Sequence, residues 1–498
     1  MTEEMKARKK VVIAGGGTAG WMAAAALSKT FGETIDLTLI ESEQIGTIGV
    51  GEATIPPLQR YNDIIGITEI DFMKQTKGTF KLGINFENWT KKDHAYFHSF
   101  GSTGKDHWTC TFNHFWMSGL ARGHNQPYGD YCLELVAAEQ NKFAHLPDNS
   151  LNYAFHLDSA QYARFLRELS EANGAVRREG KIGEVHLDPE TGNIASITME
   201  DGGEVPGDLF IDCTGFRALL IGQALGTDYD DWSHYLPCDS AIAIQTQSVG
   251  PPIPYTRSIA HEAGWQWRIP LQHRTGNGIV YCSKYISQDE ALQKISDTVE
   301  GEKLTDPNFI KFRTGARQKQ WVKNCVAVGL SSGFMEPLES TSIHLIQRNI
   351  LRLIQLMPNG DISERDIDQF NKQAEWDMET IRDFLILHYV ANERTEPFWT
   401  YCREMPIPDS LQHKIELFRE TGRVFRENEE LFAENSWIQV MMGQGIVPKA
   451  YHPLADKMSD KELEYFLSEI RSRVAKTVSS LPPHDTYVKQ YCPTNDVM

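Results

Sequence analysis

The stretch Val11-Val12-Ile13-Ala14-Gly15-Gly16-Gly17-Thr18-Ala19-Gly20-Trp21 carries four apolar residues followed at once by a G-x-G-x-x-G motif. The apolar run predicts a buried strand, the glycines predict a tight turn, and the residues from Trp21 onward predict a helix. Gly15, Gly17 and Gly20 would let the backbone approach a pyrophosphate, whose charge would lie against the free amides at the start of the helix. The stretch therefore predicts a unit that binds a dinucleotide.

A second apolar stretch, Asp36-Leu37-Thr38-Leu39-Ile40-Glu41, predicts the next strand of the same unit. It ends in Glu41, 21 residues after Gly20, where a carboxylate can accept hydrogen bonds from a ribose. The glycine motif alone is weak evidence. Strand, helix and trailing glutamate together make dinucleotide binding the expected function of this region.

The charge and cysteine content exclude several other classes of protein. The 498 residues have a formal net charge of −18, and basic residues cluster only between Lys6 and Lys10, so we predict no nucleic-acid partner. The eight cysteines are scattered without C-x-x-C or metal-ligand spacing, which predicts no metal site and reduced thiols in a cytoplasm. No apolar run is long enough to cross a bilayer, so we predict no membrane span.

Apolar segments far apart in the chain predict a single interleaved domain. Residues 183–199 have the pattern of a hairpin, and residues 208–216 and 324–330 each form an apolar strand that meets a glycine. Beyond residue 342 the pattern is mainly that of amphipathic helices. We predict an α/β fold with a core over residues 1–342, in which nucleotide-binding and β-sheet substrate regions interleave. A mainly helical C-terminal region over residues 343–498 is expected to pack on this core.

The segment Phe80-Lys81-Leu82-Gly83-Ile84-Asn85-Phe86 alternates strictly between apolar and other residues, which is strand periodicity. The pattern is compatible with an ordinary solvated lysine at position 81. It is also compatible with a Lys81 side chain that projects into a cavity, where Gly83 on the same face would leave room for a ligand. The periodicity does not decide between these two interpretations.

Two further segments combine bulk or charge in a way that chemistry could use. Gly264-Trp265-Gln266-Trp267-Arg268-Ile269-Pro270 places both tryptophans on one face of a strand, where aromatic residues serve core packing more often than ligand binding. Glu336-Pro337-Leu338-Glu339-Ser340-Thr341-Ser342 precedes a helical pattern, with Ser340 or Thr341 as its N-cap. Free amides there would attract an anion, although an ordinary capped helix has the same pattern.

Taken in order, these motifs resemble the flavin-dependent tryptophan halogenases along nearly the full length of the chain. The resemblance rests on the glycine motif, the Lys81 strand and three further segments: Val50-Gly51-Glu52-Ala53-Thr54-Ile55-Pro56, Trp265-x-Trp267-x-Ile269-Pro270 and Glu336-Pro337-Leu338-Glu339-Ser340-Thr341. The W-x-W-x-I-P segment is the specific one, because flavin monooxygenases share the glycine motif. The implied fold has a Rossmann-type FAD-binding domain of the flavin monooxygenase kind.

The resemblance implies an oxidative halogenation of an aromatic ring. FAD would arrive reduced, as FADH2, and would react with oxygen so that halide, bromide or chloride, becomes hypohalous acid. The acid would pass through an internal tunnel to Lys81, which either forms a haloamine or hydrogen-bonds the acid. A haloamine requires a neutral amine, so burial would have to lower the pKa of Lys81. Glu339 matches the second catalytic group of the family, which polarises the halogenating species or stabilises the cationic ring.

The resemblance also assigns binding residues. The halide would lie on the backbone amides of Thr341 and Ser342, the latter replacing a glycine of the best-known tryptophan-specific members. His98 and Phe100 would sandwich an indole, and Trp265 and Trp267 would separate the flavin from the organic substrate. The cofactor-binding residues expected in addition to the three motif glycines and Glu41 are Thr18, Ala19, Val50, Ala53, Val185, Asp212, Gly215, Leu330 and Ile343.

A single dinucleotide motif leaves no second site for a nicotinamide cofactor, so the implied partner is a separate NAD(P)H-dependent flavin reductase. The expected substrate is a small electron-rich arene such as indole, while tryptophan, a phenol, a pyrrole and a carrier-bound substrate stay open. A homodimer is an expectation from the family alone. Two alternatives remain: a single-component FAD monooxygenase that hydroxylates an aromatic, which would give Lys81 no role, and a flavin-binding protein without catalysis.

Overall fold

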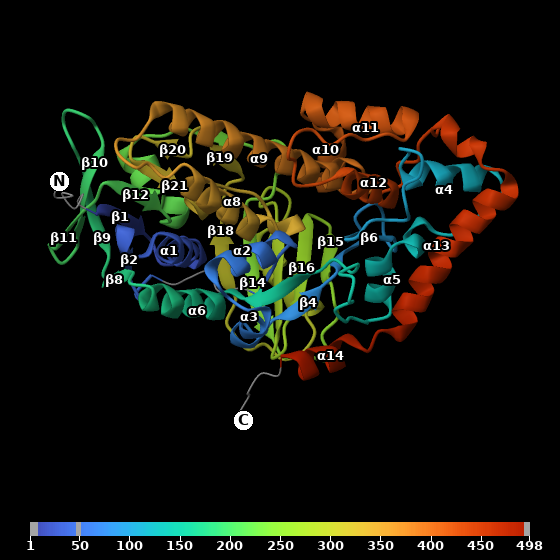
Figure 1. Ribbon diagram of the computed structural model, residues 1–498, viewed down its shortest axis with the longest axis horizontal. Helices are drawn as coiled ribbons and strands as arrows, with labels where there is room; N and C mark the ends of the chain where they lie inside the picture. Colours follow the sequence, from blue (N-terminus) through green and yellow to red (C-terminus); the bar gives the residue numbers. More distant parts are fainter. Residues whose placement is uncertain (1–7, 46–50, 493–498) are drawn as a thin grey trace, which may run out of the picture.

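The computed structural model describes residues 8–45 and 51–492, and its two main sheets lie side by side along the long axis (Figure 1). The first sheet contains the predicted dinucleotide unit. Strand β1 (Lys9–Ala14) pairs in parallel with β2 (Ile35–Glu41) on one side and with β12 (Leu209–Asp212) on the other, and β12 pairs in parallel with β21 (Cys325–Ala327). The six strands in sheet order are β20 (Trp321–Val322), β21 (Cys325–Ala327), β12 (Leu209–Asp212), β1 (Lys9–Ala14), β2 (Ile35–Glu41) and β8 (Val176–Glu179).

The second large sheet is mostly antiparallel and forms the middle of the molecule in Figure 1. Its strands in order are β18 (Asn308–Lys311), β14 (Ser240–Thr246), β17 (Thr275–Tyr281), β16 (Gly264–Pro270), β15 (Thr256–His261), β5 (Gly83–Glu87) and β6 (Ala95–Ser99). Three small sheets complete the β structure of the described residues: β3 (Gly51–Ala53), β7 (Ala154–Asp158) and β4 (Thr79–Lys81); β11 (Glu204–Pro206), β10 (Ile194–Met199) and β9 (Ile182–Leu187); β13 (Tyr229–Asp231), β19 (Gly315–Arg317) and β22 (Gly333–Phe334).

Helices cover both large sheets and make up most of the C-terminal part, as the sequence predicts. The helix after the glycine turn, α1 (Thr18–Phe31), packs its alanine-rich surface against α6 (Ser159–Ala172) and α8 (Ser342–Gln355). The other helices are α2 (Pro57–Ile65), α3 (Glu69–Gln75), α4 (Phe112–Ala121), α5 (Leu133–Glu139), α6 (Ser159–Ala172), α7 (Gln288–Thr298), α8 (Ser342–Gln355), α9 (Glu364–Val390), α10 (Pro397–Glu404), α11 (Asp409–Thr421), α12 (Glu434–Gly443), α13 (Asp460–Ser480) and α14 (His484–Tyr491).

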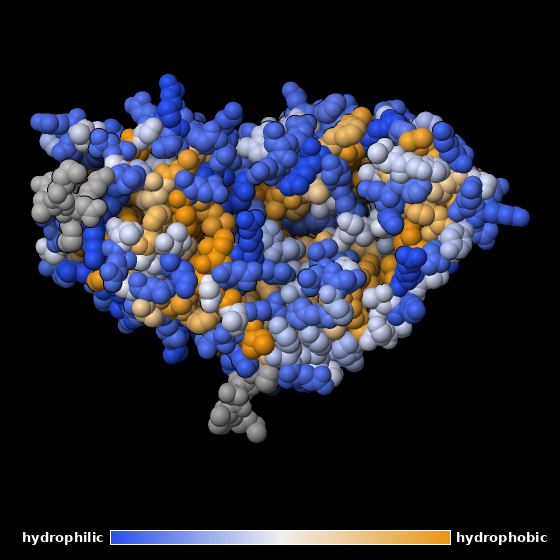
Figure 2. All heavy atoms as spheres, viewed as in Figure 1, coloured by the Kyte–Doolittle hydropathy of each residue, from blue (hydrophilic) through white to orange (hydrophobic). Residues whose placement is uncertain are grey.

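Two apolar clusters hold these layers together. One surrounds α1 and joins it to β1, β2, α6 and α8, and the other lies between the second sheet and helices α9 to α12. On the face drawn in Figure 2, hydrophilic side chains form most of the rim, and apolar side chains surround a hollow near the middle. None of the helices in the described ranges is both long and apolar enough to cross a membrane. The division of the chain near residue 342 stays a prediction.

The segment around Lys81 differs from the single strand that its alternation predicts. It forms two short strands, β4 and β5, that belong to different sheets and are separated at Leu82. The break arises because the Leu82 amide donates to Pro254 (2.7 Å) and its carbonyl accepts from Phe100 (3.0 Å), outside either ladder. The expectation that Gly83 leaves room for a ligand is wrong: an added Cβ would lie 2.3 Å from the His98 carbonyl oxygen. Gly83 allows β6 to approach instead.

A buried ion pair in the C-terminal part yields a stability prediction. Lys414 of α11 places Nζ 2.6 and 2.8 Å from the two carboxylate oxygens of Glu430, and both side chains are almost fully buried. We expect Lys414→Met to lower the free energy of unfolding by about 3–5 kcal/mol, because Glu430 is left buried without its partner. Chemical denaturation followed by circular dichroism measures this change.

The matched control is Lys449→Met, which breaks the 2.6 Å pair between Lys449 and Glu420 of the same helix. Both of its side chains are more than half exposed, so its loss should change the free energy of unfolding by about 1 kcal/mol or less. Equal effects of the two substitutions would contradict the assigned importance of burial.

Candidate functional site

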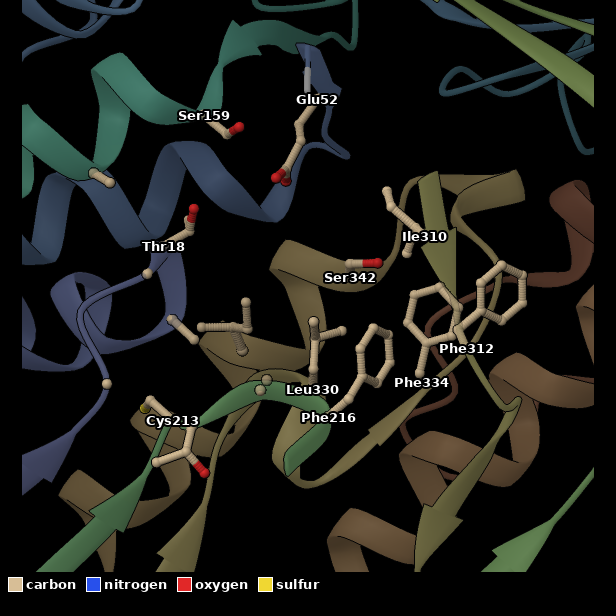
Figure 3. Close-up of a pocket in the computed structure, with 18 of the residues that line it drawn as sticks. Thr18, Glu52, Ser159, Cys213, Phe216, Ile310, Phe312, Leu330, Phe334 and Ser342 are labelled. Carbon is tan, nitrogen blue, oxygen red and sulfur yellow. The ribbon is translucent and has the colours of Figure 1, made fainter. Parts of the chain in front are cut away.

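A cavity of about 480 Å³ lies between the two large sheets and is lined by the glycine turn at one end. Gly15, Gly17, Thr18, Ala19 and Glu41 line that end, in agreement with their predicted positions. The opposite wall is formed by Trp265 and Trp267 of β16 together with residues from the segment 337–346. Figure 3 shows Thr18, Glu52 and Ser342 directed toward the space, with the rings of Phe216, Phe312 and Phe334 gathered on one side.

The geometry of the glycine turn fits the pyrophosphate of a dinucleotide. Gly17 is the N-cap of α1 without a side-chain cap bond, so the first amides of the helix are not capped by a side chain. A Cβ at Gly17 would meet nothing within 4 Å, since this residue borders the cavity. At Gly20 a Cβ would lie 1.9 Å from the Gly15 carbonyl oxygen, so this glycine allows the helix to pack against the turn.

The carboxylate of Glu41 is held at the end of β2 by two neighbours. It accepts a hydrogen bond from the Trp21 indole (3.1 Å) and one from the Arg177 guanidinium (2.5 Å). The sequence did not point to Arg177, which reaches Glu41 from the adjacent parallel strand β8. These bonds fix the carboxylate beside Gly16, where a ribose would need an acceptor.

The other residues predicted to bind the cofactor differ in whether they line this cavity. Ala53, Gly215 and Leu330 line the cavity, whereas Val50 lies outside the described residues. Val185 packs into an apolar cluster, and the start of its strand, at Ile182, lines the cavity in its place. Ile343 belongs to the core around α1, while Ser342, Leu345 and Ile346 of the same helix line the cavity.

Asp212 lies behind the cavity wall. Its carboxylate accepts bonds from the amides of Thr214, Leu220 and Ile221 and from the Thr214 hydroxyl. These bonds hold the turn at Cys213, Thr214 and Gly215, which themselves line the cavity. Asp212 therefore shapes the wall through its neighbours.

Lys81 is fully buried, which excludes the solvated lysine that its strand pattern also allowed. Its Nζ donates to the Thr54 carbonyl (3.0 Å) and to the Ser340 hydroxyl (2.8 Å), and it lies 5.1 Å from the centre of the Phe100 ring. Burial lowers the pKa of Lys81 to about 7, although the charge of Glu339 opposes this shift. A substantial fraction of the amine is consequently neutral near pH 7.

Glu339 is also buried and lies between two imidazoles. His98 Nδ1 is 2.9 Å from Oε2, and His388 Nε2 is 2.8 Å from Oε1. Burial would raise the pKa of this carboxyl, but the two histidines outweigh that effect and lower the pKa to about 2. A carboxylate only accepts, so His388 Nε2 carries a proton and its Nδ1 accepts from the Tyr96 hydroxyl, 2.6 Å away.

The segment from Pro337 to Ser342 separates the cavity from these groups. Pro337, Leu338, Ser340 and Ser342 line the cavity, whereas the side chain of Glu339 contacts the histidines. Ser340 has φ 59°, in the left-handed region that non-glycine residues rarely adopt, and its hydroxyl meets Lys81. Lys81 is thus separated from the cavity by one side chain.

The start of α8 follows this segment and has an open N-terminus. Thr341 is the N-cap, as the sequence allows, but its side chain makes no cap hydrogen bond. The next residue, Ser342, borders the cavity.

His98 and Phe100 lie beside Lys81 and Glu339, on the side away from the cavity wall. The His98 ring packs 5.4 Å from the Phe384 ring and 6.0 Å from the Phe432 ring, and Phe384 and Phe432 stack on each other. The bond between His98 and Glu339 orients the imidazole through its Nδ1. An aromatic environment thus adjoins Lys81 and Glu339.

The sequence motifs did not reveal the partners of these groups. Tyr96 and His388 are 292 positions apart, and no spacing rule connects a strand residue with the last turn of a long helix. Glu52 was quoted within a motif without a role. It lies in the cavity with its pKa raised to about 7, mainly by burial, with the nearby Asp158 adding to the shift and a bond from Ser159 opposing it.

Comparison with known proteins agrees with this geometry over almost the entire chain. The family model described as tryptophan halogenase matches residues 10–460. The tryptophan 7-halogenase RebH of Lentzea aerocolonigenes is 34% identical, covering 97% of this chain and 98% of its own length.

Solved structures of flavin-dependent halogenases superimpose closely. One from Xanthomonas campestris is 56% identical with a TM-score of 0.97, covering 98% of this chain and 99% of that chain. BrvH from Brevundimonas sp. BAL3 is 42% identical with a TM-score of 0.94 and the same coverage of both chains. The chain accordingly has the Rossmann-type FAD-binding fold and belongs to the tryptophan halogenase family of flavin-dependent enzymes.

Proposed function

We propose that this enzyme halogenates a small, electron-rich arene by passing an electrophilic halogen from the flavin cavity to Lys81 and then to the ring. The observation that carries the proposal is the position of Lys81: it is buried, bonded to the cavity-lining Ser340, and near Glu339 and the ring of Phe100. A lysine in such a place could receive a small oxidant from the cavity through Ser340 and pass the halogen to a ring held beside Phe100.

The residues around the cavity would hold FAD, which fits the open space at Gly17 and the acceptor at Glu41. Reduced FAD, with oxygen, supplies the oxidising equivalent that converts halide into hypohalous acid. The free amides of Thr341 and Ser342 at the start of α8 would hold the halide beside this space. Trp265 and Trp267 would keep the arene out of the cavity while leaving a path for the small acid.

At Lys81 the neutral amine would attack the halogen of hypohalous acid. The N–halogen bond forms as the halogen–oxygen bond breaks, and the departing hydroxide takes the amine proton to leave as water. Thr54 and Ser340 hold Nζ so that its lone pair can face the acid. The halogen is then fixed beside the ring, where orientation replaces diffusion.

Glu339 would stabilise the positive charge that develops on the ring as the carbon–halogen bond forms. Its carboxylate is ionised throughout the neutral range, since its pKa is about 2. The histidines at both oxygens prevent it from rotating. The carboxylate can also accept the ring proton that is lost when aromaticity returns.

The surroundings of His98 favour an unsubstituted indole over a charged amino acid. The rings of Phe384 and Phe432 pack on His98 and on each other, and Trp437 packs on Phe384. These apolar rings suit contact with another aromatic ring. RebH is named a tryptophan 7-halogenase, so tryptophan is the second candidate. Bromide and chloride are both proposed as co-substrates.

The test is a product analysis with the enzyme, FAD, a flavin reductase, NADH, oxygen and bromide, using indole, tryptophan and a phenol as separate substrates. We expect the bromine isotope doublet in the mass spectrum of the indole product. A product that is heavier by one oxygen would instead support a monooxygenase. Flavin oxidation without any altered arene would contradict halogenation of these substrates.

The flavin assignment predicts a specific effect of filling the glycine turn. Gly17→Ala should weaken FAD binding about tenfold, because the methyl group occupies the space proposed for the pyrophosphate. Titration of flavin fluorescence measures the affinity. Gly250→Ala is the matched control, since a Cβ there also meets nothing within 4 Å but lies outside the cavity lining. Unchanged affinity in Gly17→Ala would place the pyrophosphate elsewhere.

The lowered pKa of Lys81 predicts a pH dependence. Burial lowers this pKa to about 7, so the neutral amine increases as the pH rises through 7. We expect the halogenated product formed per reduced flavin to rise over the same interval. Pre-reduced FAD in a single turnover keeps the reductase out of the measurement. A yield that falls as the amine loses its proton would favour hydrogen bonding of the acid by charged Lys81.

The partner proposed for supplying FADH2 is a separate NAD(P)H-dependent flavin reductase. The cavity is lined by the glycines of one dinucleotide-binding motif, and the sequence contains no second motif of this kind for a nicotinamide cofactor. A cytoplasmic location is proposed because all eight cysteines are buried free thiols. The homodimer expected from the family remains part of this proposal, and sedimentation of the purified enzyme tests it.

A further inference from the structure

Glu336 is a buried carboxyl that the proposed reaction does not use. Its Oε2 accepts hydrogen bonds from the Trp265 indole (2.7 Å) and from the Tyr389 hydroxyl (2.5 Å). Within the described residues its Oε1 has no hydrogen-bond partner. Burying a carboxyl with one oxygen left without a hydrogen bond costs free energy of folding. The group therefore calls for a functional explanation.

The two donors come from different elements and share one oxygen of the carboxyl. Trp265 lies on β16 and lines the flavin cavity, whereas Tyr389 lies near the end of α9. Glu336 itself is the N-cap of the short helical turn Pro337–Glu339. One carboxyl therefore joins the cavity wall, the long helix and the turn that carries the proposed catalytic glutamate.

Adjacent residues of α9 contact the two ends of this turn. Tyr389 bonds Glu336, and the preceding residue, His388, contacts Glu339. A shift of Glu336 would hence move the Trp265 ring and the carboxylate of Glu339 together. The rings of Trp89 and Trp399 pack around Tyr389 and leave it little freedom.

Burial raises the pKa of Glu336 to about 7, and the bonds from Tyr389 and Trp265 oppose the shift. Near neutral pH the carboxyl is therefore partly uncharged. An uncharged acceptor suits a position behind an aromatic wall, because it orients the indole without a full charge next to the cavity.

We propose that Glu336 is a positioning residue that fixes the Trp265 ring in the cavity wall and the turn bearing Glu339, and thereby keeps halide oxidation coupled to halogenation of the arene. The inference rests on the proposed function. Without the carboxyl, Trp265 would turn away from its place, and the oxidant would escape from the cavity before it reached Lys81.

The experiment compares Glu336→Leu, which removes the oxygen that accepts both bonds, with Glu336→Gln, whose carbonyl can still accept from the indole and the hydroxyl. Halogenated indole and hydrogen peroxide are measured per reduced flavin in single turnovers. We expect Glu336→Leu to lower the halogenated fraction about fivefold or more, with peroxide rising, and Glu336→Gln to restore most of it. An unchanged fraction in a folded Glu336→Leu enzyme would overturn the proposal.

Two additions keep the test decisive. Tyr389→Phe removes one hydroxyl with little change in volume, so this variant can replace Glu336→Leu if Glu336→Leu fails to fold. We expect Tyr389→Phe to lower the halogenated fraction as well. An unchanged fraction in Tyr389→Phe would contradict the proposal. The second addition is quenching of tryptophan fluorescence by bound FAD, which requires no turnover. The part contributed by Trp265, obtained with Trp265→Phe, should change in Glu336→Leu and persist in Glu336→Gln.

The fluorescence comparison separates this proposal from the proposed function. If wild-type enzyme halogenates nothing but the Trp265 contribution still depends on Glu336, the positioning role holds and the reaction is wrong. A Trp265 contribution that is the same in all Glu336 variants overturns the positioning role, whatever the product.

Discussion

Lys81→Met should abolish halogenation while FAD binding and flavin oxidation continue. The substitution keeps an unbranched apolar chain in the buried site but removes the amine that holds the halogen. Hypohalous acid would then have to find the ring by diffusion, so we expect the rate of halogenation to fall by at least on the order of a thousandfold. Product formation from indole, measured against oxidation of pre-reduced FAD, gives the rate.

The same variant should be more stable than the wild type. Folding lowers the pKa of Lys81 from 10.5 to about 7, so between these values the unfolded chain binds the extra proton. The group therefore opposes folding at neutral pH, and the opposition weakens as the pH rises toward 10.5. A higher melting temperature together with lost activity would exclude misfolding as the cause. Lys74→Met, at an exposed lysine of α3, is the control and should keep full activity. Halogenation at the wild-type rate in Lys81→Met would refute the relay.

Glu339→Gln should slow halogenation of the ring by about 10²–10³-fold, because the neutral amide cannot stabilise a developing cation as the carboxylate does. The amide keeps the size of the side chain, and its carbonyl can still accept from one of the two histidines. Oxidation of halide occurs in the cavity, away from this carboxylate, and should be unaffected. The halogenating equivalent should therefore accumulate on the enzyme and be detectable by titration with a thiol.

The control for this second substitution is Glu404→Gln, whose side chain is largely exposed at the end of α10. It changes the net charge by the same amount and should leave the rate unchanged. If Glu339→Gln lowers flavin oxidation and halogenation equally, Glu339 acts in the cavity and its assignment to the ring is wrong. Glu339→Gln should also change the pKa of Lys81. Because the negative charge of Glu339 raises the pKa of the lysine, removing that charge should lower this pKa further.

Local patterns in the sequence were sufficient to predict the dinucleotide unit. The apolar run before Gly15, the glycine spacing and the acidic end at Glu41 depend on neighbours in the chain, and each lies as predicted. The parallel pairing of β1, β12 and β21 was also predictable, because three apolar strands ending at glycines suit a single buried sheet. Lys81 was recognised as a candidate, but only the structure shows that it is buried.

Contacts between distant segments were not predictable. His388 and Tyr96 lie at buried positions of a helix and a strand, where the sequence indicates only packing. Nothing in it marks His388 as a partner of Glu339, or Tyr96 as a partner of His388. Glu336 has the pattern of an ordinary residue before a proline. Val185 and Ile343 were assigned through resemblance, and the structure places both side chains in apolar clusters. Sequence spacing identifies a loop or strand, but the direction of one side chain depends on tertiary packing.

The most direct test of the central claim is a single turnover of the wild-type enzyme, Lys81→Met and Lys74→Met with pre-reduced FAD, oxygen, bromide and indole. The account predicts the bromine doublet from the wild type and Lys74→Met, none from Lys81→Met, and equal oxidation of flavin in all three. Bromoindole formed equally by Lys81→Met would contradict transfer through the lysine, and an oxygenated indole from all three would contradict halogenation itself.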